Sequence, residues 1–174
     1  MSVRVPALVF DTSVLSAFVS AQQLAVLRDF GATHRLVTTH AVIDELGAAD
    51  GVTPDLTWLE VAHVDSLAEL RVLVRYAGVL GSGEHDMGEA TVMTWAEVHE
   101  ATALIDDEAA KRAGRRHKVS CHGTLWLVIE AYKADRLDVA GAESLVDRLA
   151  ETNARFPCDG ASLFEWARQQ QLLE

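Results

Sequence analysis

The stretch Ala7-Leu-Val-Phe10-Asp11-Thr-Ser13-Val-Leu15 decides the fold class, because an uninterrupted apolar run ends there in an acid. Residues 5–10 form a continuous apolar segment, which predicts a strand buried on both faces, as in parallel sheets. A carboxylate at the end of such a strand is costly unless it is paired or bound to a ligand. Asp11 is therefore the first candidate functional residue.

Strands and helices are expected to alternate along the rest of the chain. The apolar patterns predict strands over residues 35–38, 58–64, 103–106 and 119–121. They predict helices over residues 12–28 with a break near Ser20, 39–47, 66–80, 87–99, 108–113, 123–132, 139–150 and 161–170. Gly47 and Gly114 are expected to end two of these helices, with a loop over 48–54. This order predicts an α/β sandwich with a mostly parallel sheet.

The bulk composition is that of a protein in water rather than in a membrane. The chain of 174 residues is long enough for one domain with a substantial core, and it is 49% apolar and 24% charged. No apolar run is long enough for a membrane span, and residues 1–6 lack the pattern of a signal peptide, which predicts a cytoplasmic protein. Cys121 and Cys158 form no motif, and no two histidines are spaced i, i+4, which disfavours a zinc site.

Acidic residues stand at four separate places where a strand turns into a helix or a helix opens. They are Asp11, Glu45, Glu89 and the pair Asp106-Asp107. The carboxyl ends of parallel strands line the functional crevice of such folds, so these acids are expected to meet there. Clustered carboxylates repel one another unless a cation lies between them, and hard oxygen ligands suit Mg²⁺ or Mn²⁺. Such ions most often serve phosphoryl transfer or phosphodiester cleavage.

Each acid also has a purely structural interpretation. Asp11 and Asp107 could cap the helices that follow them, and Asp86-Met-Gly-Glu89 fits a capping box. Glu45 could be a solvated helix residue, and Glu84 is a further acid in a loop. For a single acid the structural interpretation is favoured, but the combination favours a shared site.

The net charge of −11 opposes the approach of a nucleic acid, whose phosphates dominate its affinity for proteins. A local basic run offsets this. Lys111, Arg112, Arg115, Arg116 and Lys118 hold five of the fifteen positive charges within eight residues. The run could hold a polyanion beside the acids, or it could simply solvate the C-terminal end of a helix.

Five of these pieces, in this order, resemble the motifs of PIN-domain proteins. The pieces are residues 11–15, 43–47, 88–90, 104–112 and the helix opened by Gly123-Thr124-Leu125. They are most similar to the VapBC-type toxin ribonucleases and to related bacterial and archaeal PIN proteins. The resemblance covers residues 5–155, with the C-terminal helices over 139–172 expected to pack on that part, so the chain is expected to be one domain over 1–174.

The resemblance implies a fold, an activity and partners. The fold is a three-layer α/β/α sandwich with a Rossmann-like sheet. The activity is that of an endoribonuclease dependent on Mg²⁺ or Mn²⁺. Homodimers are implied as well, with a small cognate antitoxin as partner in a type II toxin–antitoxin pair.

The resemblance also assigns roles to residues. Asp11, Glu45, Glu89 and Asp107 are the four catalytic acids. Asp11, Asp107, Glu89 and Asp106 are the metal ligands, with Asp106 competing with Asp107 for the fourth position. Thr124, with Thr12 or Ser13, supplies an accessory hydroxyl. We assign RNA contacts to Lys111, Arg112, Arg115 and Arg116. Glu89 stands where the family often has Asp, and its side chain is one methylene longer.

Other functions compete with this one. A non-catalytic PIN domain that binds nucleic acid or protein is the main alternative. Phosphatases of the haloacid dehalogenase type carry Asp-x-Asp at the first strand, whereas this chain has Asp11-Thr12-Ser13. A receiver domain needs a phosphorylated Asp at a middle strand, and no residue of this chain fits that position. A Rossmann dinucleotide-binding domain is disfavoured because no Gly-x-Gly-x-x-Gly follows a strand.

Overall fold

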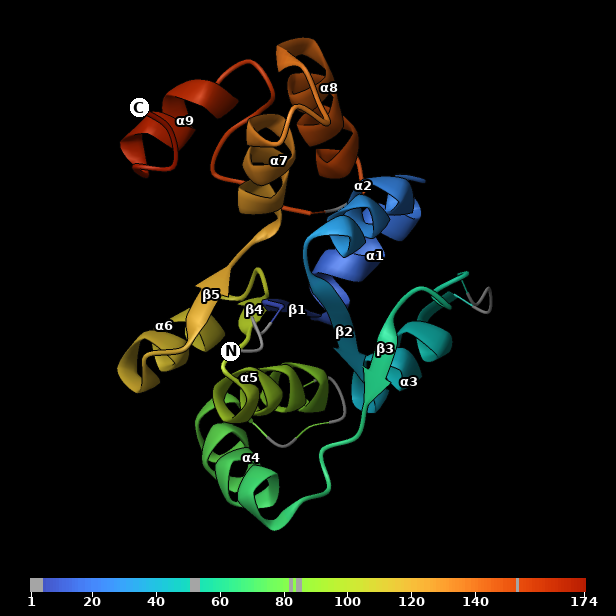
Figure 1. Ribbon diagram of the computed structural model, residues 1–174, viewed down its shortest axis with the longest axis vertical. Coiled ribbons are helices and arrows are strands. Elements are labelled where there is room, and N and C mark those ends of the chain that lie inside the picture. The colour runs from blue at the N-terminus through green and yellow to red at the C-terminus, as the bar shows by residue number, and fades with distance from the viewer. Residues whose placement is uncertain (1–4, 51–53, 82, 84–85, 153) are drawn as a thin grey trace.

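A parallel sheet forms the centre of the computed structural model, which describes residues 5–50, 54–81, 83, 86–152 and 154–174 (Figure 1). Within these residues the sheet has five strands in the order β3-β2-β1-β4-β5, and every pair is parallel. The strands are β1 Ala7–Phe10, β2 Arg35–Thr39, β3 Glu60–Ala62, β4 Thr102–Leu104 and β5 Ser120–His122. The sheet is therefore fully parallel over the described part of the chain.

Helices cover both faces of this sheet. They are α1 Thr12–Ser20, α2 Leu24–Arg28, α3 His40–Asp50, α4 Leu67–Leu80, α5 Met87–His99, α6 Glu108–His117, α7 Thr124–Lys133, α8 Val139–Ala150 and α9 Leu163–Gln169. In Figure 1, α4 and α5 lie below the strands, and α1, α2, α7, α8 and α9 lie above them. The arrangement confirms the predicted three-layer α/β/α sandwich.

The central strand is β1, the apolar run that ends at Asp11. Leu8, Val9 and Phe10 are almost completely buried between the helix layers. The backbone N–H of Asp11 continues the pairing with β4 by donating to the carbonyl of Leu104 at 2.9 Å. The chain runs outward from β1 to β2 and β3 on one side and to β4 and β5 on the other. Such a reversal opens a crevice at the carboxyl ends of β1 and β4.

Several predicted boundaries differ from the structure. Two strands are displaced by one or two residues: β4 begins at Thr102 and ends at Leu104, before Asp106, and β5 runs over Ser120–His122. Strands β1 and β3 are shorter than predicted: β1 begins only at Ala7, and β3 covers only Glu60–Ala62. A short 3₁₀ helix over Asp29–Ala32 was not predicted.

Glycine was a poor guide to where two helices end. α3 continues through Gly47 to Asp50, so the loop predicted from residue 48 is wrong over 48–50, and residues 51–53 lie outside the described part. α6 continues through Gly114 to His117 and ends at Lys118, which adopts a left-handed conformation. A Cβ on Gly114 would collide with Cys121 and Met93, so this glycine serves close packing within a helix.

Candidate active site

Asp11 is the centre of the candidate site. It is 2% exposed and caps α1, with its Oδ2 accepting hydrogen bonds from the Ser13 backbone N–H at 3.0 Å and the Ser13 hydroxyl at 2.6 Å. Within the described residues its other oxygen, Oδ1, is buried without a hydrogen-bond partner. Burial raises the pKa of Asp11 to about 6, with a smaller contribution from Glu45. The residue is therefore a cap with one oxygen free for a ligand.

Glu45 is held by two elements other than its own helix. Its Oε2 accepts a hydrogen bond from the hydroxyl of Thr12 on α1, and its Oε1 accepts one from the backbone N–H of Gly88 at 2.7 Å. Gly88 lies in the first turn of α5, where backbone N–H groups lack partners within the helix. These bonds draw Glu45 toward Asp11 rather than into solvent.

Glu89 follows Gly88 on α5 and experiences the other acids directly. Burial raises the pKa of Glu89 to about 7, and the charges of Asp11, Asp107, Asp86 and Glu45 contribute to the increase. The predicted capping box does not form, because Asp86 makes no side-chain hydrogen bond as the N-cap of α5. Glu89 is therefore a half-buried acid facing other acids, which a capping role does not explain.

Asp106 and Asp107 have different neighbours although they are adjacent. Asp106 accepts two hydrogen bonds from Thr124, from the backbone N–H at 2.8 Å and from the hydroxyl at 2.7 Å. The backbone N–H of Asp106 also reaches the Ser13 hydroxyl at 3.4 Å. Asp107 caps α6 by accepting from the Ala110 backbone N–H at 2.8 Å. Asp107 is among the charges that raise the pKa of Glu89.

The accessory hydroxyls each contact a different acid. Thr12 donates to Glu45, Ser13 donates to Asp11, and Thr124 donates to Asp106. Thr124 is completely buried and opens α7 directly after β5. These bonds connect the loops after β1, β4 and β5, so the three loops form one edge of the sheet.

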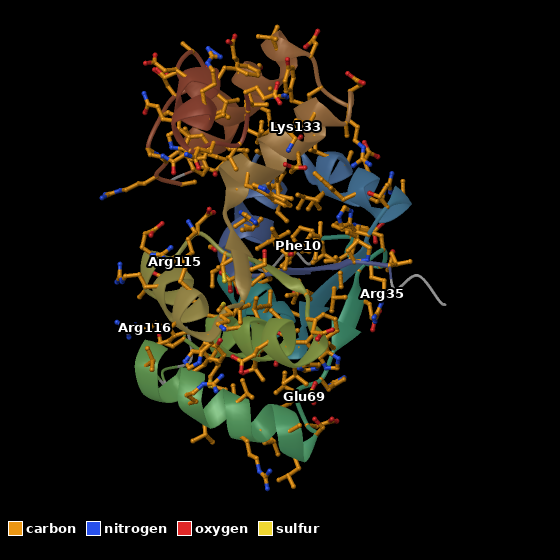
Figure 2. All side chains as sticks on the ribbon, turned by 60° about the vertical axis from the view of Figure 1, so that its left-hand side comes forward. Phe10, Arg35, Glu69, Arg115, Arg116 and Lys133 are labelled. Carbon is orange, nitrogen blue, oxygen red and sulfur yellow. The ribbon has the colours of Figure 1, made fainter. Side chains whose placement is uncertain are left out.

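The basic run lies on α6, directly after the Asp106-Asp107 pair. Arg112, Arg115 and Arg116 are exposed, while Lys111 is largely covered and pairs with Glu108 at 3.0 Å. In Figure 2, Arg115 lies on the side of α6 toward the C-terminal helices, and Arg116 lies on the side toward α4. The run therefore spreads around the helix instead of forming a single stripe.

The oxygen donors of the site are of the kind that a hard divalent cation prefers, but within the described part of the chain they are not gathered around one point as a complete set of ligands. The donors are carboxylate oxygens, and the buried free Oδ1 of Asp11 is an atom that a cation would satisfy. Within the described residues, however, no three His, Cys, Asp or Glu side chains are grouped as ligands to one ion. The raised pKa values of Asp11 and Glu89 have the direction expected for acids that lack a nearby positive charge. Glu84 lies outside the described residues.

Two features of this region were not predicted from the sequence. The backbone N–H of Gly88 positions Glu45, whereas the sequence identifies Gly88 only as part of a motif. His122 and Trp126 stack with ring centroids 4.3 Å apart and planes inclined by 12°. Their i, i+4 spacing around Gly123, next to a basic run, is the signal that could have identified them.

The structure defines a parallel α/β protein with acids at the carboxyl ends of β1 and β4. Residues 7–162 match the family model of the PIN domain, and the chain therefore belongs to the PIN-domain family. PIN domains are generally nucleases, which act on nucleic acids and typically use divalent metals. No curated protein sequence matches the chain. Within the described residues, no helix is both long and apolar enough to cross a membrane.

Proposed function

We propose that this PIN-domain protein is an endoribonuclease that hydrolyses RNA phosphodiester bonds with Mg²⁺ or Mn²⁺. The observation that carries the proposal is the buried, unpartnered Oδ1 of Asp11 beside Glu89, whose pKa is raised to about 7. A purely structural cap does not require a second acid held against it, because the two charges repel. A site for a divalent cation does require such an arrangement, since the cation offsets the repulsion.

The residues have separate roles in this proposal. Asp11 is the main ligand to the cation, assisted by Asp107 and Glu89. Glu45 binds the cation directly or through water, in the orientation given by Thr12 and Gly88. Asp106 has both oxygens on Thr124, so we assign it to positioning the loop after β5 rather than to the principal ligand set.

The reaction follows from these roles. When bound, the cation polarises a phosphodiester oxygen and lowers the pKa of a coordinated water. We assign the proton of the attacking water to Glu89, which lies among the other acids and accepts it as the new P–O bond forms. The bond to the leaving oxygen breaks in line, and that oxygen ends as a hydroxyl after it gains a proton. Because the acids interact strongly, they titrate as a group.

The biological setting is a further part of the proposal. By analogy with the toxin ribonucleases that the motifs resemble, we propose that the protein acts in the cytoplasm as the toxin of a type II toxin–antitoxin pair. It would act as a homodimer and be inhibited by a small antitoxin. The exposed arginines of α6 would contact either RNA phosphates or an acidic segment of that antitoxin.

A non-catalytic PIN domain is the alternative that the structure keeps open. Within the described residues, the absence of a closed group of metal ligands is the observation that favours it. The two functions differ in their dependence on metal. A binding module would retain its RNA affinity without cleaving RNA in any metal.

The test is RNA cleavage over a titration of Mg²⁺ and Mn²⁺, with EDTA as the blank and Asp11→Asn purified in parallel. We expect cleavage by the parent alone, with no 2′,3′-cyclic phosphate at the new ends, because water and not the 2′-hydroxyl attacks. Cyclic ends, or equal cleavage by Asp11→Asn, would indicate a contaminating ribonuclease. Binding without cleavage at every metal concentration would favour the non-catalytic module.

A further inference from the structure

A pocket of about 660 Å³ lies beside the acidic crevice, between the β5–α7 segment, α6 and the C-terminal residues. The volume falls within the range of roughly 300–1,000 Å³ that is usual for small-molecule sites. Its lining includes Gly123 and Asp106, which is one of the two acids after β4. Ser13 connects the pocket to the crevice, since its hydroxyl contacts both Asp11 and the Asp106 backbone N–H.

The walls of the pocket combine aromatic rings with cations. His122 ends β5, its stacked partner Trp126 lies in the first turn of α7, and Trp166 comes from α9. Lys111 and Arg115 come from α6, and Lys111 is paired at 3.0 Å with Glu108, which also lines the pocket. Arg115 lies on the side of α6 facing the C-terminal helices (Figure 2). The protein as a whole carries a charge of −11, so cations concentrated with aromatic rings at one place need an explanation.

A third cation reaches the pocket from a different part of the chain. Arg155 lies in the segment between α8 and α9, is exposed, and lines the pocket. Burial lowers the pKa of His122, so its imidazole is neutral near pH 7 and can present a π-face to a neighbour. Arg115 and Arg155 for phosphate, and several ring faces for a base, supply the two halves of nucleotide recognition in single strands.

We propose that this pocket holds one unstacked nucleotide of the RNA strand, with its base against Trp126 or Trp166 and its phosphate near Arg115 and Arg155. The proposal rests on the proposed function, because it names a substrate subsite for the same crevice. It goes beyond that function by naming what the pocket binds and by assigning binding roles to residues outside the group of acids. Trp166 also lies beyond residues 7–162, so part of this pocket comes from outside the matched PIN region.

The occupant we infer is a nucleotide within a strand rather than a free nucleotide. Asp106 lines the pocket, and its backbone N–H contacts the Ser13 hydroxyl, which is bonded to Asp11. A strand that places one base in the pocket would therefore have its neighbouring phosphodiester near Asp11. A free nucleotide has no adjoining phosphodiester to place near Asp11.

The test measures binding without metal, so that it does not depend on cleavage. A fluorescein-labelled single-stranded oligouridylate is titrated with protein in EDTA, and versions with an abasic residue at each position in turn are compared. We expect one abasic position to weaken binding by about 5- to 150-fold, the range that base–aromatic stacking gives. In Trp126→Leu and Trp166→Leu, which keep an apolar side chain, the abasic penalty should shrink markedly in at least one variant.

A matched pair of charge variants tests the phosphate half. Arg155→Gln should weaken binding of the intact oligonucleotide, whereas Arg71→Gln, the same change on the exposed surface of α4, should not. Circular dichroism and thermal melting confirm that each variant is folded. Equal losses in the two variants would show a general charge effect and overturn the assignment of Arg155.

The other results of the abasic and competition experiments also decide whether the nucleotide subsite exists. An abasic penalty that is uniform along the strand, or unchanged in both tryptophan variants, overturns the subsite. Competition by uridine monophosphate at the affinity of the oligonucleotide would mean that the pocket takes free nucleotides and not a strand. If the abasic pattern holds and no metal supports cleavage, the subsite stands while the proposed ribonuclease function fails. If RNA is cleaved but the pattern is absent, only the subsite fails.

Discussion

The backbone N–H of Gly88, in the first turn of α5, donates to the Oε1 of Glu45 on α3 at 2.7 Å. The bond joins two helices that are far apart in the sequence and fixes the carboxylate with the free N–H of a helix start. The absence of a side chain at Gly88 is what makes this approach possible, because a Cβ there would collide with both oxygens of Glu45.

Gly88→Ala should therefore displace Glu45 and reduce RNA cleavage by about tenfold or more, in keeping with the sensitivity of catalysis to small displacements. Gly47→Ala is the matched control, since a Cβ at Gly47 on α3 meets no atom within 4 Å. That control should keep full activity and gain roughly 0.5–1 kcal/mol of stability from the better helix former. Steady-state cleavage rates and thermal melts of the two variants check the prediction, and equal activity in both would contradict it.

Asp11→Asn should abolish cleavage while leaving the fold intact. The amide oxygen can still accept the hydrogen bonds of Ser13 that cap α1, but the variant lacks the charge that a cation needs. In metal-free buffer near neutral pH the variant should be more stable than the parent, because a buried charge is removed. Thermal melting and a cleavage assay test this together. Loss of activity accompanied by unfolding would instead assign Asp11 to capping alone.

The contribution of Asp11 and Glu89 to the stability of the metal-free protein should fall as the pH rises from about 4 to about 7. The pKa of Asp11 is raised from 3.8 to about 6 and that of Glu89 from 4.5 to about 7, so the folded state retains protons that the unfolded chain releases. For Asp11 alone the effect is at most roughly 3 kcal/mol, from 1.36 kcal/mol for each pH unit.

Comparison with Asp11→Asn isolates this effect, since other titrating groups such as His34 and His122 are common to both proteins. The advantage of the variant should grow between pH 4 and pH 6 and then level off. Adding Mg²⁺ or Mn²⁺ at pH 7.5 should stabilise the parent and have little effect on the variant. A difference that does not change with pH would mean that Asp11 titrates normally.

Asp106→Asn and Asp107→Asn should separate the two candidates for the fourth acid. Asn is an efficient N-cap, so Asp107→Asn should keep α6 stable while losing most cleavage activity. Asp106→Asn replaces one of the two oxygens that accept from Thr124, and it should cost about 1 kcal/mol of stability. Urea unfolding and metal-dependent cleavage rates are the measurements. The reverse pattern would make Asp106 the ligand and Asp107 only a cap.

Neutralising Arg112, Arg115 and Arg116 together should weaken RNA binding and flatten its dependence on salt. The log–log slope should fall by about 0.7 for each phosphate of a single strand that the variant no longer neutralises. Affinity for Mn²⁺ should remain nearly unchanged, because these side chains lie exposed on α6 rather than among the acids. Binding titrations over a salt series check this. If the triple variant binds and cuts as the parent does, the arginines do not lie on the path of the RNA.

The order of elements and the identity of the acids could be read from local patterns. The apolar run before Asp11 predicted a buried strand, because a strand covered on both faces has apolar side chains on both. The helix expected from about Met87 to His99 is present over Met87–His99, and its apolar spacing follows the helical period. The helix ends predicted at Gly47 and Gly114 were wrong. Gly114 stays within α6 where it packs closely against Cys121 and Met93, whereas Gly47 lies within α3 where an added Cβ would meet no atom within 4 Å, so its low helix propensity alone did not end that helix.

The relations between the acids depended on the tertiary structure. The sequence by itself determined which residues carry charge and that parallel strands would bring their following loops to one edge. Only the packing of α3 against α5 placed Glu45 on the Gly88 backbone, and only the turn after β5 paired Thr124 with Asp106. These contacts join residues far apart in the chain, and a local pattern carries no information about how two helices dock. The pocket of Trp126, Arg155 and Trp166 has the same origin, because three distant segments enclose it.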